Sequence, residues 1–160
     1  MPATNADWMP HVVVACVVER DGRFLLVEER IAGELVLNQP AGHWEPGETL
    51  VEAAVRETLE ESGWDVQPTH LLGVYEWQPE TLPYPFVRFA YVATALRHHP
   101  DRVLDTGIER AVWMTPDEID ASAARLRSPS VRACVADYLA GKRYPLTLIQ
   151  HQTPALARRG

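Results

Sequence analysis

Cysteine is scarce in this sequence: Cys16 and Cys134 are the only two among 160 residues. Each lies inside an apolar run and they are far apart along the chain, so we expect two buried thiols rather than a disulfide. The 6 histidines are scattered and do not join the cysteines at the spacing of zinc ligands. This scarcity argues against a disulfide-stapled secreted domain and against a Cys/His metal site.

Long apolar runs and an excess of basic charge are also missing. No stretch approaches the roughly 20 apolar residues of a membrane-spanning helix. Residues 1–8 have neither a basic start nor the apolar segment of a secretory signal, so we expect a cytoplasmic protein with no membrane partner. A formal net charge of -7 argues against a nucleic-acid partner but leaves small phosphorylated substrates open.

The sequence contains no repeat, linker or low-complexity segment. A chain of 160 residues with 46% hydrophobic content is long enough to bury the core of one domain. We expect a lead-in at 1–10, one α+β domain at 11–149 and a C-terminal tail at 150–160, frayed from residue 155. Oligomeric state stays open between monomer and homodimer.

The clearest local element is a helix predicted for residues 49–62. Thr49 is a suitable N-cap, and Glu52 three residues later completes a capping-box pattern. Gly63 stands where a helix commonly ends in a left-handed residue. The sequence therefore defines both ends of this helix.

This helix carries an unusual charge pattern. At 100° per residue, Glu57, Glu60 and Glu61 fall on one face. The opposite face, expected to be buried, carries Val51, Val55, Thr58 and Leu59. Two of the glutamates lie in the last turn, where the helix dipole is negative, so a positive group must offset the repulsion. Seen alone, such a helix is most simply an acidic surface face without a ligand.

The segment before the helix changes that interpretation. Five residues separate Gly42 from Glu48, and seven more separate Glu48 from residues 56–64. This pattern resembles the signature of the Nudix hydrolases, GX5EX7REUXEEXGU, where U is a bulky apolar residue. All seven fixed positions match, a coincidence expected on the order of once in a million sequences. Thr58 departs from the first U position, and Trp64 fits the second.

Carboxylates at this spacing suit phosphoanhydride chemistry. Cleaving a pyrophosphate requires hard divalent cations to neutralise phosphoryl oxygens while water attacks phosphorus. Oxygen ligands favour Mg²⁺, with Mn²⁺ as a substitute. The resemblance implies that the Gly42 carbonyl, Glu57, Glu60 and Glu61 hold the metal, and that Arg56 orients a catalytic glutamate by ion pairing. The catalytic set is therefore expected to be Arg56, Glu57, Glu60 and Glu61.

The rest of the chain predicts a mixed sheet. Strands are expected at 11–19, 23–30, 35–39, at Val66, and at 71–78, 86–94 and 110–114. A hairpin turn is expected at Asp21-Gly22 and a proline-rich loop at 79–85. Short helices are expected to begin at Thr115-Pro116 and at Ser128-Pro129. This order is similar to the Nudix α/β/α sandwich, in which a mixed sheet lies between helices.

Several further segments resemble one bacterial phosphatase branch of the family. These are residues 11–18, 38–43, 50–54, 126–129 and 143–146. The resemblance implies hydrolysis of nucleoside di- and triphosphates and of thiamine-type pyrophosphates, including hydroxymethylpyrimidine pyrophosphate and thiamine pyrophosphate, with release of inorganic phosphate.

Candidate substrate-binding residues are fewer and less specific. Arg88 shares a face of its predicted strand with apolar residues, so it is either a phosphate clamp or part of an interior ion pair. Tyr75 and Trp77 alternate on the preceding strand and either stack on a base or simply pack. Gln39 and His43 flank Gly42 and are candidate donors to substrate, although a solvated loop explains them equally well.

Some alternatives stay open at this stage. The general base is not assigned among Glu57, Glu60, Glu61, Asp105 and Glu109. A Nudix hydrolase of another specificity, for ADP-ribose or a mutagenic nucleotide, is the alternative enzyme. Two alternatives are not enzymes: a nucleotide sensor that binds without catalysis, and a protein with a structural acidic helix. Loss of a motif glutamate would favour the sensor, but every motif glutamate is present.

Overall fold

The structure, a computed structural model, describes residues 8–152, so the tail segment 155–160 lies outside the described residues. The elements follow the predicted order. They are β1 (His11–Arg20), β2 (Arg23–Ile31), β3 (Glu34–Asn38), β4 (Ala41–His43), α1 (Leu50–Ser62), β5 (Trp64–Trp77), β6 (Phe86–His98), β7 (Ile108–Met114), α2 (Pro116–Ala121), α3 (Pro129–Leu139) and two short 3-10 turns, Ala123–Arg125 and Leu146–Leu148. None of the helices in this part of the chain is long and apolar enough to cross a membrane.

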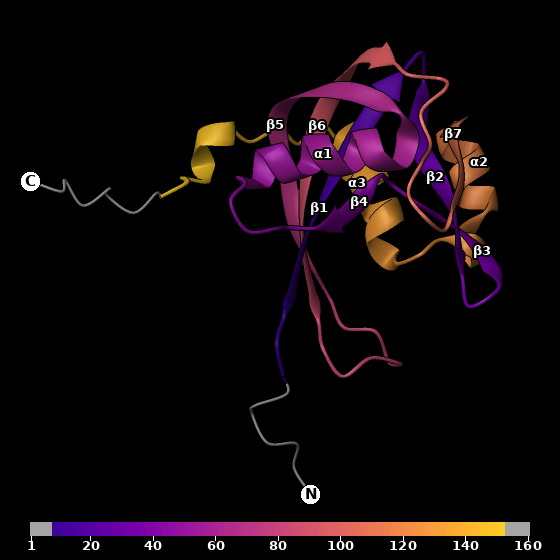
Figure 1. Cartoon of the computed structure of the whole chain (residues 1–160), viewed down its shortest axis with the longest axis horizontal. Coiled ribbons are helices and arrows are strands. Elements are labelled where there is room, and N and C mark those ends of the chain that lie inside the picture. The colour runs from indigo at the N-terminus through magenta and orange to yellow at the C-terminus, as the bar shows by residue number, and fades with distance from the viewer. Residues whose placement is uncertain (1–7, 153–160) are drawn as a thin grey trace, which may run out of the picture.

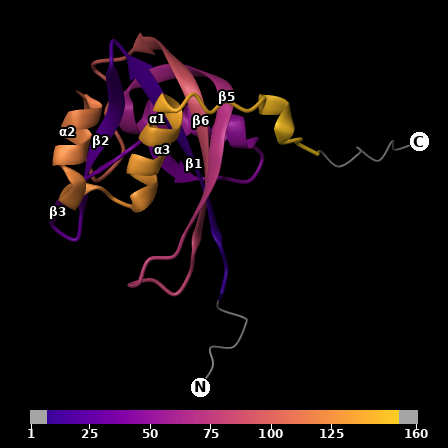
Figure 2. The ribbon, with the colours of Figure 1, turned by 180° about the vertical axis from the view of Figure 1, so that it is seen from behind.

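The strands form one mixed sheet. Its order is β3-β2-β1-β6-β5, with β4 pairing to β1 and β7 to β2. β1 runs parallel to β6, and the other pairs are antiparallel. Figures 1 and 2 show α1 on one face of the sheet and α3 on the other. The predicted α/β/α sandwich is therefore confirmed.

Alternation along β1 builds a core on each face of the sheet. Val14, Cys16 and Val18 pack beneath α1, whereas Val17 packs on the other face beside Cys134 of α3. Both cysteines are buried free thiols, as predicted. Burial raises the pKa of the Cys16 thiol to about 12, so this group stays protonated and behaves as a small apolar side chain.

The predicted turn and helix ends are confirmed. Asp21 and Gly22 have φ values of 53° and 76°, which suits a two-residue hairpin loop of the primed type. Thr49 and Glu52 exchange both bonds of the capping box, at 3.1 and 2.7 Å. Gly63 ends α1 with a φ of 72°. These features are local, which is why the sequence defines them.

The predicted buried face of α1 is confirmed in part. Thr58 is buried, and Val51 and Val55 are partly buried against the core beneath the helix. The buried residues of the helix are Ala53, Ala54, Glu57, Thr58, Glu61 and Ser62, whereas Leu59 is only partly buried. Small alanines let the helix backbone approach β1, where the Cys16 thiol lies 3.5 Å from the Ala54 carbonyl oxygen. This close approach turns Glu57 and Glu61 inward rather than toward solvent.

Strand lengths also differ from the prediction. β5 is continuous from Trp64 to Trp77, whereas the sequence predicts strand only at Val66 and from residue 71. Its pairing with β6 shifts register at Pro68, a position where a proline in a strand is tolerated. β6 continues to His98 as the partner of this longer strand. β4 was not predicted, because a three-residue segment containing glycine has no strand pattern.

Candidate active site

Gly42 gives the first structural constraint on the site. It lies in β4, directly against the side chain of Glu57 from α1. A Cβ atom at position 42 would overlap the Glu57 carboxyl group. Glycine is therefore required here for close approach, and it brings the β4 backbone beside the first glutamate of the acidic face.

Arg56 supplies the positive charge that the acidic helix needs. Its guanidinium donates two hydrogen bonds to the Glu48 carboxylate, at 2.9 and 2.7 Å. The Nη1 atom also donates to Glu57 at 2.8 Å and to Glu60 at 3.1 Å. Because Nη2 also bonds the His43 carbonyl at 3.0 Å, Arg56 is fully engaged, and it is not among the residues that line the cavity described below.

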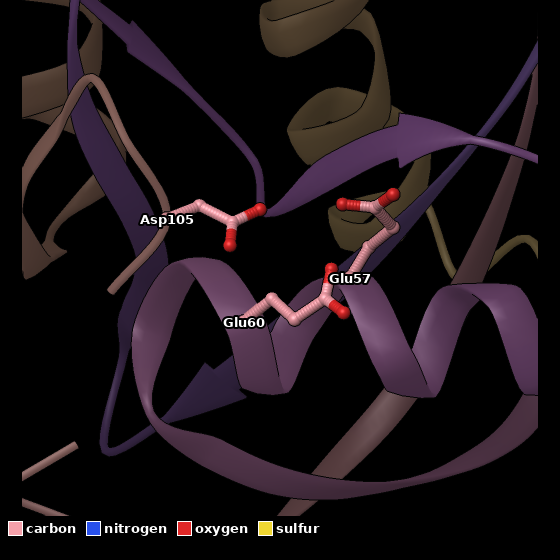
Figure 3. A group of neighbouring side chains, drawn as sticks. All are labelled: Glu57, Glu60 and Asp105. Carbon is pink, nitrogen blue, oxygen red and sulfur yellow. The ribbon is translucent and has the colours of Figure 1, made fainter. Parts of the chain in front are cut away.

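A cluster of three carboxylates lies above α1. Glu57, Glu60 and Asp105 each bring one oxygen to within 4.8 Å of the others, and Figure 3 shows the three groups converging. Asp105 belongs to the loop between β6 and β7. Its N–H donates to the Glu60 carbonyl at 3.0 Å, and the His99 N–H donates to Gly63 at 2.8 Å. The loop is thus attached to the end of α1.

Glu61 has a different environment from this carboxylate cluster. Its side chain is 9% exposed and accepts a hydrogen bond from the Ala41 N–H at 3.0 Å. Burial is the main cause that raises the pKa of Glu61 to about 8, and the Glu57 charge adds to it. Burial also raises the pKa of Glu57, although Arg56 opposes that change. The site therefore disfavours the ionised forms of the Glu57 and Glu61 carboxyl groups.

These groups face a cavity of about 380 Å³. Carboxylates line part of it, among them Glu57, Glu61 and Asp105. Polar and aromatic groups from β3, β5, β6 and the start of α3 line the same cavity: Asn38, Tyr75, Trp77, Phe86, Arg88, Arg127, Ser128 and Ser130. A cavity lined by both acidic and basic groups can hold a cation and an anion together.

Arg88 is 6% exposed and lines this cavity. It donates to the side-chain oxygens of Gln39 and Asn38, both at 2.9 Å. Within residues 8–152 no carboxylate forms an ion pair with it, so the interior ion pair considered as the alternative is absent. The Gln39 amide donates onward to the Val131 carbonyl at 2.8 Å, and Gln39 does not line the cavity. Gln39 therefore orients Arg88 and is not placed as a substrate donor.

The other candidate binding residues do line the cavity. Tyr75 uses its hydroxyl internally, donating to Asp137 at 2.8 Å. Trp77 stacks on Phe86 with ring centroids 5.7 Å apart, which leaves a flat aromatic surface at the base of the β5–β6 hairpin. His43 Nε2 lies 2.9 Å from His11 Nδ1, and burial lowers the pKa of His43. At neutral pH His43 is an uncharged hydrogen-bonding group.

Sequence reasoning overlooked part of this site. Glu109 is exposed, pairs with Arg30 at 2.8 Å and does not line the cavity, so it is not placed to act as a general base. Asp105, considered as a base, instead joins the carboxylate cluster. Arg127, Ser128 and Ser130 were not singled out at all. The signal available was that residues 126–129 lie in a segment similar to the phosphatase branch.

Comparisons with known proteins agree with the fold described above. Residues 9–134 match the NUDIX domain family. The chain is 45% identical over 141 residues to the phosphatase NudJ of Escherichia coli strain K12, covering 88% of this chain and 90% of that protein. A NUDIX hydrolase structure from Nitrosomonas europaea aligns with a TM-score of 0.88 at 47% identity, covering 90% of this chain and 98% of the other. A MutT NUDIX hydrolase from Burkholderia pseudomallei aligns at 0.66 and 25% identity, covering 81% and 98%.

In metal-free protein, Glu61→Gln is expected to melt at a higher temperature than the parent at alkaline pH. The pKa of about 8 in the folded state lies above the ordinary value of 4.5, so the folded parent binds this proton more tightly than the unfolded chain does. Parent stability therefore falls as pH rises between these two values, whereas the variant has no proton to lose. Its advantage should grow from about pH 5 to about pH 8 and then level off.

Thermal melts in chelator across this pH range test the prediction, with Glu34→Gln, an exposed glutamate on β3, as the matched control. An advantage that does not change with pH, or a variant that melts lower throughout, would show that the Glu61 carboxylate is not strained in the folded state.

Proposed function

The chain belongs to the Nudix hydrolase family and is an enzyme of that kind, and we propose that it is a Mg²⁺-dependent pyrophosphate hydrolase that releases inorganic phosphate. The proposed substrates are nucleoside di- and triphosphates and thiamine-type pyrophosphates, including hydroxymethylpyrimidine pyrophosphate. The phosphatase activity in the name of the 45% identical relative supports this choice.

One observation carries the proposal: Glu57 and Asp105, two members of the carboxylate cluster, line the same cavity as the buried guanidinium of Arg88. A metal-bound pyrophosphate has a cation at one end and excess negative charge at the other. The carboxylates of the cavity are complementary to the cation, and Arg88 is complementary to the phosphate charge. Neither the cation nor the phosphate alone would match both sets of groups.

The donor set suits a hard divalent cation. Glu57, Glu60 and Asp105 offer oxygen atoms, as Mg²⁺ prefers, and Gly42 leaves the space that a Cβ atom would fill. In this proposal these three carboxylates hold the ion, with the Gly42 carbonyl beside them. Bound there, Mg²⁺ would neutralise charge on phosphoryl oxygens. Arg56 is a positioning residue, because it fixes Glu57 and Glu60 without lining the cavity.

The remaining groups divide between binding and proton transfer. Arg88 binds phosphoryl oxygens through charge-assisted hydrogen bonds. Trp77 and Tyr75 give a surface on which a pyrimidine or purine ring packs, and His43 offers a neutral ring nitrogen beside it. Glu61 lines the cavity outside the carboxylate cluster and takes the proton of the attacking water, a role that suits its raised pKa.

Replacing a carboxylate of the cluster should abolish most turnover. Glu57→Gln and Glu60→Gln are each expected to lower kcat by about 100-fold or more, because the carboxylate charge acts on the transition state. Steady-state assays of a nucleoside diphosphate with Mg²⁺ measure this. The matched control is Glu109→Gln, which removes an exposed carboxylate outside the cavity. Unchanged kcat in both cluster variants contradicts the site.

The products report which phosphorus is attacked. A nucleoside triphosphate should yield orthophosphate and the diphosphate, because the proposed reaction takes place at the terminal phosphoryl group. Separate assays of orthophosphate and pyrophosphate distinguish the outcomes. Pyrophosphate with the monophosphate as main products would instead favour a Nudix hydrolase of another specificity.

A further inference from the structure

The N-terminus of α3 opens into the same cavity. Ser128 is the N-cap of this 11-residue helix and, unlike Thr49 and Thr115, makes no side-chain capping bond. The first turn of a helix forms the positive end of the helix dipole. In α3 Pro129 has no N–H and the Val131 N–H donates to the Ser128 carbonyl at 3.2 Å, so the Ser130 N–H is the donor among the first three positions that a ligand can use. Ser128 and Ser130 both line the cavity, so this end of α3 is directed at its contents.

Ser128 has a second unusual property. It is 5% exposed, and within the described part of the chain its hydroxyl oxygen has no hydrogen-bond partner. Leaving a buried hydroxyl unpaired is unfavourable, and native proteins rarely do so without a reason. A ligand with acceptor atoms at this end of the cavity would provide the missing partner.

Two arginines point to the charge of that ligand. Arg88 is buried and donates to the neutral amides of Gln39 and Asn38, and Arg127 is half-buried and lines the cavity. Neither forms an ion pair with a carboxylate within residues 8–152. Burying a cation without a counter-charge is costly. The negative charge of Glu61 favours the cationic form of Arg88, and Glu61 lines the same cavity.

We propose that Ser128, Ser130 and Arg127, together with Arg88 and the N-terminus of α3, form a phosphate subsite that holds the terminal phosphoryl group of the substrate. Two guanidinium groups, a helix N-terminus and two hydroxyls suit an anion with several acceptor oxygens better than a neutral ring. The subsite lines the same cavity as Glu57 and Asp105 of the carboxylate cluster, so one pyrophosphate would contact both. This assignment rests on the proposed function, and it makes orthophosphate a ligand of the enzyme.

Orthophosphate binding tests the subsite without any need for turnover. Calorimetric titrations of the full chain with inorganic phosphate, in Mg²⁺ and in chelator, should give a Kd that rises about tenfold in Ser128→Ala and in Arg127→Gln. The control for charge is Arg132→Gln on the same helix, because Arg132 is exposed and pairs with Asp120 at 2.9 Å. It should leave the Kd unchanged.

Thermal melts separate ligand binding from helix capping. Thr115 accepts a capping bond from the Glu118 N–H at 3.2 Å, so Thr115→Ala should lower Tm and keep the increase in Tm produced by phosphate. Ser128→Ala removes a hydroxyl that caps nothing. It should leave Tm without phosphate unchanged or slightly raised, and it should lose most of the increase with phosphate.

The outcomes also separate this proposal from the proposed function. An unchanged Kd in both subsite variants, or no phosphate binding by the parent in either condition, overturns the subsite even if the enzyme hydrolyses pyrophosphates. Weakened phosphate binding in an enzyme that hydrolyses none of them keeps the subsite and overturns the function. If the subsite and the proposed function are both correct, phosphate inhibits competitively with substrate. Noncompetitive inhibition would place the anion outside the reaction pocket and overturn the assignment of the subsite.

Discussion

The arrangement of the site depends on one guanidinium group. Arg56 holds Glu48, Glu57 and Glu60 through hydrogen bonds of 2.7 to 3.1 Å, and these three carboxylates would otherwise repel one another. The bidentate bond to Glu48 also fixes the loop that leads into the helix. Arg56 bonds one carboxylate oxygen of Glu57, and Glu57 lines the cavity.

Arg56 cannot neutralise the whole site. The cavity therefore keeps unfavourable buried negative charge at its acidic residues and unfavourable buried positive charge at its basic residues. On the acidic side Glu61 is buried with a raised pKa. On the basic side Arg88 lacks a carboxylate partner, and the Ser128 hydroxyl is unpaired within residues 8–152. Each of these features opposes folding, and proteins tolerate such conflicts mainly where function needs them. A cation beside the acidic residues and a phosphate beside the basic residues would relieve all of them together.

The sequence predicts the parts of this site that are local. The caps of α1 at Thr49 and Gly63, and the spacing from Gly42 to Glu60, follow from helical geometry and a fixed motif. The prediction of the buried face of α1 was incomplete. Periodicity favours valine and leucine in the interior, whereas close packing against β1 buries Ala53 and Ala54 most deeply and leaves Glu57 and Glu61 facing inward. Tertiary packing thus overrides the apolar pattern.

The sequence did not predict the contacts between distant segments. Asp105 reaches the carboxylate cluster because two backbone bonds attach its loop to α1, and no local pattern marks that attachment. Arg88 was recognised on its strand, but its amide partners come from β3 and the residue after it, 49 and 50 positions away. The N-terminus of α3 was placed correctly along the chain, without any indication that it lines the same cavity as Glu57 and Glu61.

Direct measurement of Mg²⁺ binding is the most decisive test, because the central claim is that Glu57, Glu60 and Asp105 form one metal site. Calorimetric titration of Mg²⁺ into Asp105→Asn should show an affinity lower by about tenfold or more than that of the parent, since a ligand oxygen loses its charge. Glu109→Gln, a few residues further along the chain, should bind as the parent does. An Asp105→Asn variant with unchanged Mg²⁺ affinity would contradict the account.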